Sequence, residues 1–208
     1  QSGHHELAWA LMRKNIAVAK KYVDDALNKA SGCESIVFSS EEFEFLRDFK
    51  VAKNLFPKNA SIHVLCYFRR QDKYLESEYN QHVKMVSTRL STDIFKFFMY
   101  HDFYRRFNYM AIISGWEKPG FVDKFSIFSY DKEAKKNNLL GSFFECIGFD
   151  FYKHGVDFKS QVDNKSITPS VLIYLARYNN EDGGEGFRGK FLDLVSEEVF
   201  NKNKKEGK

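Results

Sequence analysis

The sequence predicts an α/β fold of three layers (α/β/α) with a parallel central sheet. Residues 62–68 are almost continuously apolar, which is typical of a central strand covered on both faces. A polar turn and an amphipathic helix follow this segment, as they also follow residues 35–38. Strand, short turn and helix, repeated along a chain, indicate a parallel sheet with helices on its faces. The 208 residues, 43% of them hydrophobic, suffice for a single domain over residues 1–208.

The first part of the chain predicts a helix, a strand and a second helix. Apolar residues recur at steps of three or four between residues 6 and 30, and Gly32 is a suitable C-terminal stop. Residues 35–38 form a short apolar run, which we expect to be a buried strand whose end presents polar residues. A helix over residues 41–55 is expected to follow, because an apolar side recurs there and Pro57 lies just past its end.

The rest of the chain predicts further helices and one more strand. An apolar stripe after the strand at 62–68 predicts a helix over residues 72–88. Thr168 and Pro169 suit the N-cap and first position of a late helix that ends near residue 179. The other expected elements are an aromatic helical region at 93–118, a strand at 125–130, a short helix at 138–147, a loop at 182–186 and a last helix at 187–201.

Composition and charge exclude several classes of protein. The net charge of +4, from 32 basic and 28 acidic residues, is too small for a dedicated nucleic-acid-binding protein, so no nucleic-acid partner is expected. No apolar run approaches the ~20 residues of a membrane helix, so no membrane partner is expected either. Cys33, Cys66 and Cys146 are odd in number and widely spaced, which predicts a reducing compartment and a cytoplasmic location.

An anion site is expected where the strand at 62–68 ends. Arg69 and Arg70 follow this strand, and the next helix carries Ser77, eight positions after Arg69. Open α/β sheets bind ligands at the C-terminal ends of their strands, where a helix N-terminus adds N–H donors. An arginine offers a two-pronged donor to phosphate oxygens, and a serine adds a hydroxyl. The alternative is that both arginines terminate the strand and pair with surface carboxylates.

This segment resembles the 3′-phosphate-binding element of the P-loop sulfotransferases, whose donor is 3′-phosphoadenosine-5′-phosphosulfate. In that family an apolar strand ends in arginine and a helix supplies a serine eight residues later, which is the spacing of Arg69 and Ser77. The proline that usually follows the arginine is replaced by Arg70-Gln71, as in bacterial polysaccharide-type members. The resemblance implies a P-loop NTPase-like fold in which Arg69 and Ser77 hold the donor's 3′-phosphate. It also implies that the acceptor is a hydroxyl, most naturally on a carbohydrate.

Four other segments agree with the same family in their order, so the resemblance covers about residues 33–180. One of them ends in Glu41, where the family presents Ser-Glu to the acceptor, and another ends in the aromatic–acidic pair Tyr130-Asp131. The four segments are Ile36–Glu41, Trp116–Asp131, Leu140–Phe149 and Asn164–Ser170. None is specific by itself, and the resemblance depends on their common order.

The main departure from the family is the absence of its Gly-rich loop, which holds the 5′-phosphosulfate through backbone N–H groups and a lysine. No G-x-x-x-x-G-K-[ST] or related pattern occurs in the sequence. Because this loop belongs before Gln1, the sequence predicts an N-terminally incomplete fold. Loss of even one such donor costs about 10²–10³-fold in rate, so these 208 residues alone are expected to be inactive. A missing central strand would leave an exposed sheet edge and favour a homo-oligomer.

Glu41 is the candidate general base. Sulfuryl transfer resembles phosphoryl transfer, in which positioning and electrostatics dominate and the acceptor hydroxyl needs a base. Glu41 follows the predicted strand at 35–38, which resembles the second strand of the family, and Glu42 is the adjacent substitute. The alternative is that both are first-turn glutamates favoured by the helix dipole. His4-His5-Glu6 predicts no metal site, because adjacent histidines do not share a helix face and no further ligand follows at a suitable spacing.

Three functions fit this pattern. The first is a sulfotransferase acting on a carbohydrate or another hydroxyl acceptor. The second is a kinase-like transferase on the same P-loop scaffold, and the third is a binding module that keeps the fold without catalysis. The aromatic stretch 95–109 contains the pair Arg105-Arg106, which suits contact with an anionic sugar. The alternative is that this stretch is a core helix with a solvated basic face.

Overall fold

The chain forms two compact units in a computed structural model that describes residues 3–85, 87–136, 138–149 and 169–179. Unit 1 comprises Gln1–Phe68 with Tyr104–Ser129, and unit 2 comprises Arg69–Phe103 with Tyr130–Lys208. The described residues contain both helices and strands, and their two strands form a parallel sheet. The chain is therefore an α/β protein.

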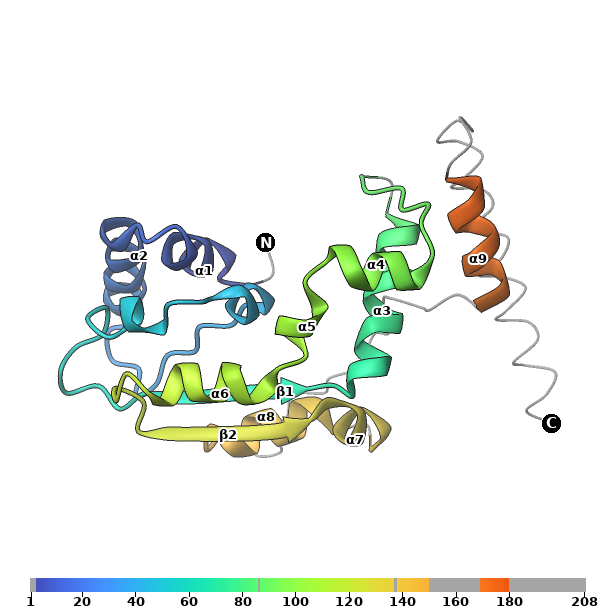
Figure 1. Cartoon of the computed structure of the whole chain (residues 1–208). Helices are drawn as coiled ribbons and strands as arrows, with labels where there is room; N and C mark the ends of the chain where they lie inside the picture. Colours follow the sequence, from blue (N-terminus) through green and yellow to red (C-terminus); the bar gives the residue numbers. More distant parts are fainter. Residues whose placement is uncertain (1–2, 86, 137, 150–168, 180–208) are drawn as a thin grey trace. The chain divides into compact units, whose positions relative to one another are not determined.

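The sheet belongs to unit 1 and consists of β1 (His63–Phe68) and β2 (Lys124–Ser129), which run side by side in Figure 1. The two strands are parallel and in register, so that His63 lies opposite Lys124 and Phe68 lies opposite Ser129. The predicted strands at 62–68 and 125–130 are therefore confirmed. The prediction that residues 62–68 are covered on both faces is wrong, because β1 is only half-buried along its length. In the described two-stranded sheet each strand keeps one edge without a neighbouring strand.

Two helices, α1 (His5–Met12) and α2 (Ile16–Lys29), replace the single helix predicted over residues 6–30. Lys14 between them has a φ of 56°, which ends the helical path. The side chain of Asn15 accepts a hydrogen bond from the N–H of Val18 at 3.2 Å and so caps α2. The polar residues between the two helices therefore end one helix and begin the next.

Residues 35–38 are not a strand, and residues 41–55 are not one α-helix, contrary to the predictions. The His4 N–H donates to the Ser39 carbonyl at 2.6 Å, and the Ser39 N–H donates to His4 Nδ1 at 3.0 Å. These bonds satisfy backbone groups just after residues 35–38 that a sheet would otherwise pair. Two short 3₁₀ helices follow, η1 (Glu41–Phe45) and η2 (Phe49–Ala52), with extended backbone at Leu46 between them.

The core of unit 1 lies among α1, α2 and the two 3₁₀ helices. Its buried residues are Leu7, Ala10, Leu11, Ala19, Val23, Leu46, Phe49, Ala52 and Leu55. Helix α6 (Tyr109–Glu117) joins this core through Trp116, whose ring meets that of Phe49 edge-on with centroids 5.1 Å apart. The chain segment that leads to β2 is thus fixed against η2.

Gly115 on α6 is required by the close approach of Phe49. A Cβ at this position would overlap the Phe49 ring. Gly115→Ala should therefore lower the free energy of unfolding by about 1–2 kcal/mol, because overpacking of about 1–3 kcal/mol exceeds the gain of at most about 1 kcal/mol in helix propensity. Urea denaturation measures the change. In a Phe49→Leu background the same substitution should cost nothing, and an equal loss there would contradict the steric explanation.

Unit 2 is helical in its described part. Its elements are α3 (Gln71–Lys84), α4 (Ile94–Tyr100), α7 (Tyr130–Lys135), α8 (Leu139–Cys146) and α9 (Pro169–Tyr178), and α5 (Phe103–Arg106) lies at the division between the units. Phe97, Val83 and Leu175 are almost fully buried. The Asn179 amide donates to the carbonyls of Val83 and Leu90 at 3.0 and 2.7 Å, which fastens the end of α9 to the end of α3.

The helix predictions for this part of the chain are confirmed for α3, α8 and α9, although α3 ends four residues before the predicted boundary at 88. The aromatic region 93–118 is helical, as predicted, and contains the three helices α4, α5 and α6. Asp102 has a φ of 55°, and the Asn108 side chain accepts from the N–H of Ala111 at 3.0 Å, so each of these residues marks a break. Helix α7 was not predicted. Thr168, the loop 182–186 and the helix 187–201 lie outside the described residues.

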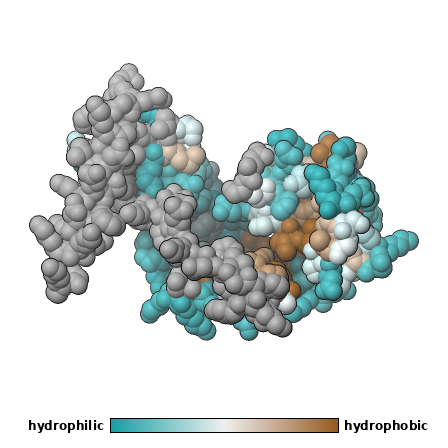
Figure 2. Space-filling model, turned by 180° about the vertical axis from the view of Figure 1, so that it is seen from behind, coloured by the Kyte–Doolittle hydropathy of each residue, from teal (hydrophilic) through white to brown (hydrophobic). Residues whose placement is uncertain are grey.

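The surface of the described residues carries both polar and apolar side chains. Figure 2 shows one face on which most described residues are hydrophilic and hydrophobic ones form smaller areas. The largest exposed fractions of apolar side chains are on α4, where Phe95 is 80% exposed, Tyr100 79% and Met99 75%. Within the described part of the chain, no helix combines the length and the apolar character needed to cross a bilayer.

Candidate functional site

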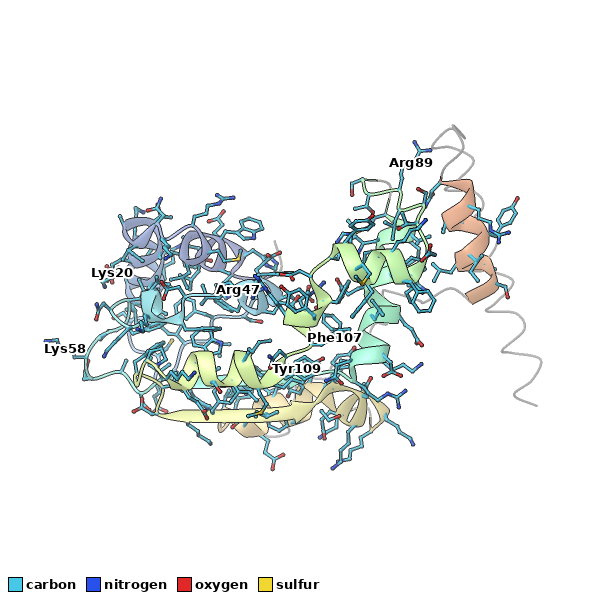
Figure 3. The ribbon with its side chains drawn as sticks, viewed as in Figure 1. Lys20, Arg47, Lys58, Arg89, Phe107 and Tyr109 are labelled. Carbon is cyan, nitrogen blue, oxygen red and sulfur yellow. The ribbon has the colours of Figure 1, made fainter. Side chains whose placement is uncertain are left out.

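The candidate site begins where β1 and β2 end. Phe68 and Ser129 are partners in the parallel register, so both strands end at the same end of the sheet. Tyr109, labelled in Figure 3, stacks on Phe68 with ring centroids 4.3 Å apart and so covers the end of β1. Arg69 and Arg70 follow β1 and lead into α3, while α7 begins directly after β2.

Asp131, just after β2, accepts hydrogen bonds from the two residues that follow β1. The Nε of Arg69 donates to Asp131 Oδ1 at 3.3 Å, and the backbone N–H of Arg70 donates to Asp131 Oδ2 at 2.8 Å. The guanidinium of Arg69 also lies over the ring of Tyr130, 5.3 Å from its centroid, within the range of a cation–π contact. One carboxylate therefore holds an arginine side chain and a backbone N–H.

Arg70 has a carboxylate partner of its own. Its Nε and Nη2 donate to the two oxygens of Asp72, each at 2.6 Å, in a bidentate pair on the surface. The hydrogen bond from Arg70 lowers the pKa of the Asp72 carboxyl to about 2, and the same bond raises the pKa of Arg70. Asp72 is thus ionised at neutral pH. Both arginines therefore pair with carboxylates, as the alternative stated for this segment expects.

Ser77 lies in the second turn of α3 and is partly buried. The rotation of α3 about its axis is fixed by its apolar positions, because Tyr79 and Val83 are buried within unit 2. The structure thus places Arg69 and Ser77 in one strand–turn–helix segment, in the order that the sequence predicts.

Glu41 occupies the first position of η1 in unit 1, whereas Arg69 and Ser77 belong to unit 2. Its side chain is exposed. The hydroxyl of Ser40 caps η1 by accepting from the N–H of Glu42 at 3.1 Å. The strand that was expected to present Glu41 is absent from residues 35–38, so the 3₁₀ helix and its cap position this carboxylate instead.

Sequence reasoning missed three residues at these two places. Asp131 was noted as part of a family pattern but not as the partner of Arg69, and its position just after a parallel strand was the available signal. His4 and His5 were considered only for metal binding. His5 Nδ1 lies 2.8 Å from the hydroxyl of Ser40, and no local pattern predicts this contact across 35 positions.

The pair Arg105-Arg106 divides into an exposed and a buried residue. Arg106 is 7% exposed, and its Nη2 donates to Glu44 Oε1 at 2.6 Å. The same guanidinium lies 5.0 Å from the centroid of the Phe45 ring. Arg105 is exposed and donates from Nε to the hydroxyl of its neighbour Tyr104 at 2.8 Å. Arg106 is therefore a structural residue of unit 1, in agreement with the core alternative.

His63 and Cys66 on β1 have packing roles. His63 Nε2 lies 2.9 Å from the hydroxyl of Ser126 on β2, and burial, followed by the charge of Lys124, lowers the pKa of the imidazole. Burial raises the pKa of the Cys66 thiol to about 11, so this thiol stays protonated and is a poor nucleophile at neutral pH. Among the described residues, no three His, Cys, Asp or Glu side chains gather where they could hold a metal ion.

Comparisons with known proteins give one relative. A protein of Archaeoglobus fulgidus, described as an uncharacterized protein, is 30% identical over 150 residues. The match covers 70% of this chain and 38% of that protein, so the chain spans well under half the length of this relative. A search of protein-family models finds no match. A search of solved structures finds none either.

Proposed function

We propose that the protein is a sulfotransferase-type domain whose donor is 3′-phosphoadenosine-5′-phosphosulfate and whose acceptor is a carbohydrate hydroxyl. The observation that carries the proposal is one segment: β1 ends before Arg69, α3 begins at Gln71, and Ser77 lies in its second turn. The parallel strand β2 beside β1 is consistent with it. On this proposal the sheet is the middle of three layers in a P-loop NTPase-like fold. The three free cysteines, Cys33, Cys66 and Cys146, agree with a reducing cytoplasm.

Each candidate residue has a defined role in the proposed reaction. The guanidinium of Arg69 and the hydroxyl of Ser77 donate hydrogen bonds to the donor's 3′-phosphate. Glu41 accepts the proton of the acceptor hydroxyl while the new S–O bond forms. The bond between sulfur and the phosphate oxygen breaks in the same displacement, and adenosine 3′,5′-bisphosphate leaves.

Arg69→Ala should weaken the binding of adenosine 3′,5′-bisphosphate by about 1.5–3 kcal/mol, which is about 10- to 150-fold in Kd, because a hydrogen bond to a charged group is lost. Isothermal titration calorimetry of the 208-residue chain measures the effect. Lys73→Ala is the matched control, since Lys73 is a cation in the first turn of α3 that pairs with Glu76 on the surface. Equal affinities of wild type and Arg69→Ala would remove Arg69 from the donor site.

Titration with both nucleotides, together with an assay of sulfuryl transfer, separates the proposed function from its two rivals. Preference for ATP over adenosine 3′,5′-bisphosphate would favour a kinase-like transferase. Binding of adenosine 3′,5′-bisphosphate through Arg69 and Ser77, without transfer in any longer form of the protein, would favour a binding module. Binding of neither nucleotide would contradict the proposal and the kinase-like alternative alike.

A further inference from the structure

The carboxylate of Asp131 occupies the donors that a phosphate would use at the end of β1. Its two oxygens accept from the Arg69 guanidinium and from the Arg70 N–H, at 3.3 and 2.8 Å. A guanidinium and a backbone N–H at the start of a helix are also the donors that bind phosphate oxygens in parallel α/β proteins. The carboxylate therefore stands in this structure where an anionic ligand is expected.

Each arginine at this end of the sheet has a carboxylate partner. Arg69 pairs with Asp131, and Arg70 pairs with Asp72. A phosphate group that approaches the paired arginines also meets these two carboxylates, which repel it. Binding of a phosphate requires one arginine to exchange its carboxylate for the ligand.

We propose that Asp131 is an internal counter-ion which fills the anion position and leaves Arg69 when the phosphate of a ligand binds. This inference rests on the proposed function for the identity of the nucleotide, and it concerns the regulation of that same site. Asp131 therefore sets the affinity of the site for phosphate by competing with it.

The geometry favours exchange at Arg69 over exchange at Arg70. The pair between Arg69 and Asp131 is a hydrogen bond of 3.3 Å, and the two side chains are 33% and 37% exposed. The pair between Arg70 and Asp72 is bidentate at 2.6 Å. Both pairs are in contact with water, and one long hydrogen bond is lost more easily than two short ones, so Arg69 is the arginine that exchanges its partner. The ring of Tyr130 can keep the Arg69 guanidinium in place during the exchange.

Asp123 provides a matched comparison at the opposite ends of the same strands. Its Oδ2 accepts from the backbone N–H of Ile62 at 2.7 Å, just as Asp131 accepts from that of Arg70 at 2.8 Å. Each aspartate thus flanks β2 and holds the chain beside β1. The additional contact that distinguishes them is the Arg69 guanidinium, which Asp131 holds.

The test is calorimetric titration of the 208-residue chain with inorganic phosphate and, separately, with adenosine 3′,5′-bisphosphate. Asp131→Asn keeps an acceptor for the Arg70 N–H but removes the charge, so both ligands should bind about three- to tenfold more tightly. Asp123→Asn should leave both affinities unchanged. Adding Arg69→Ala to Asp131→Asn should abolish the gain. Asp131→Ser provides a second variant, and circular dichroism checks that each protein is folded.

Opposite results identify what has failed. If folded Asp131→Asn and Asp131→Ser bind phosphate equally or less tightly than wild type, Asp131 orients Arg69 rather than competing for it, and the inference is overturned. If phosphate binding to these variants is undetectable, it is overturned as well. If both ligands show the expected gain but the nucleotide binds no better than inorganic phosphate, the inference stands and the proposed donor is wrong.

Discussion

Phe97→Ala should lower the free energy of unfolding by about 3–5 kcal/mol, the range for removing a buried aromatic ring. Phe97 is 1% exposed and lies at the centre of the aromatic cluster of unit 2. Its ring meets those of Tyr79, His82, His101 and Phe103, with centroid distances from 4.4 to 5.6 Å. Removing the ring leaves a cavity that these neighbouring rings cannot fill without leaving their rotamers. Urea denaturation followed by circular dichroism measures the loss.

Phe95→Ala is the matched control on the same helix. Phe95 is 80% exposed, so the identical change should alter the free energy of unfolding by no more than about 0.5 kcal/mol. A loss below about 1 kcal/mol for Phe97→Ala would show that the aromatic cluster does not support unit 2. A large loss for Phe95→Ala would show instead that the exposed face of α4 is covered in solution.

Glu41→Gln should lower the turnover of sulfuryl transfer by about 10²–10⁴-fold, because a glutamine cannot accept the acceptor's proton. The measurement requires a form of the protein that carries out the transfer. The affinity for adenosine 3′,5′-bisphosphate should change little, since on this proposal Glu41 acts on the acceptor hydroxyl and not on the donor's 3′-phosphate.

Glu42→Gln is the control for this substitution. It changes the neighbouring carboxylate to the same amide, and its N–H can still donate to Ser40 to cap η1. We expect turnover within about threefold of wild type. If Glu41→Gln were nearly as active as wild type and Glu42→Gln were not, the base would be Glu42. If both retained turnover, the base would lie elsewhere.

The apolar pattern of a local segment predicted the elements whose apolar residues all lie within that segment. β1 is marked by a continuous apolar run and α3 by an apolar stripe, and both exist close to the predicted bounds. Residues 35–38 carry the same kind of apolar run without forming a strand. Their neighbour Ser39 is bound by His4, 35 positions away, and a contact of that range leaves no mark in the local sequence.

The candidate site was predictable to a similar extent. The spacing of Arg69 and Ser77 is a property of one continuous segment, so the strand–turn–helix arrangement could be predicted. The partner of Arg69 was not predicted, because Asp131 lies 62 positions away, the sequence contains many other carboxylates, and the position of Asp131 just after a strand was not used. Only the parallel pairing of β1 with β2 selects Asp131 among them.

The parallel pairing has a kinetic consequence. The aspartates flanking β2 bind backbone N–H groups 61 positions earlier in the chain, so the intervening loop must close before either bond can form. The entropy of loop closure grows slowly with length, by about 0.6 kcal/mol per doubling, but contacts of long range slow folding markedly. The encounter of β1 and β2 is therefore expected to limit the folding rate. Both aspartate bonds need the strands in register, so they form after this encounter and act mainly by slowing unfolding.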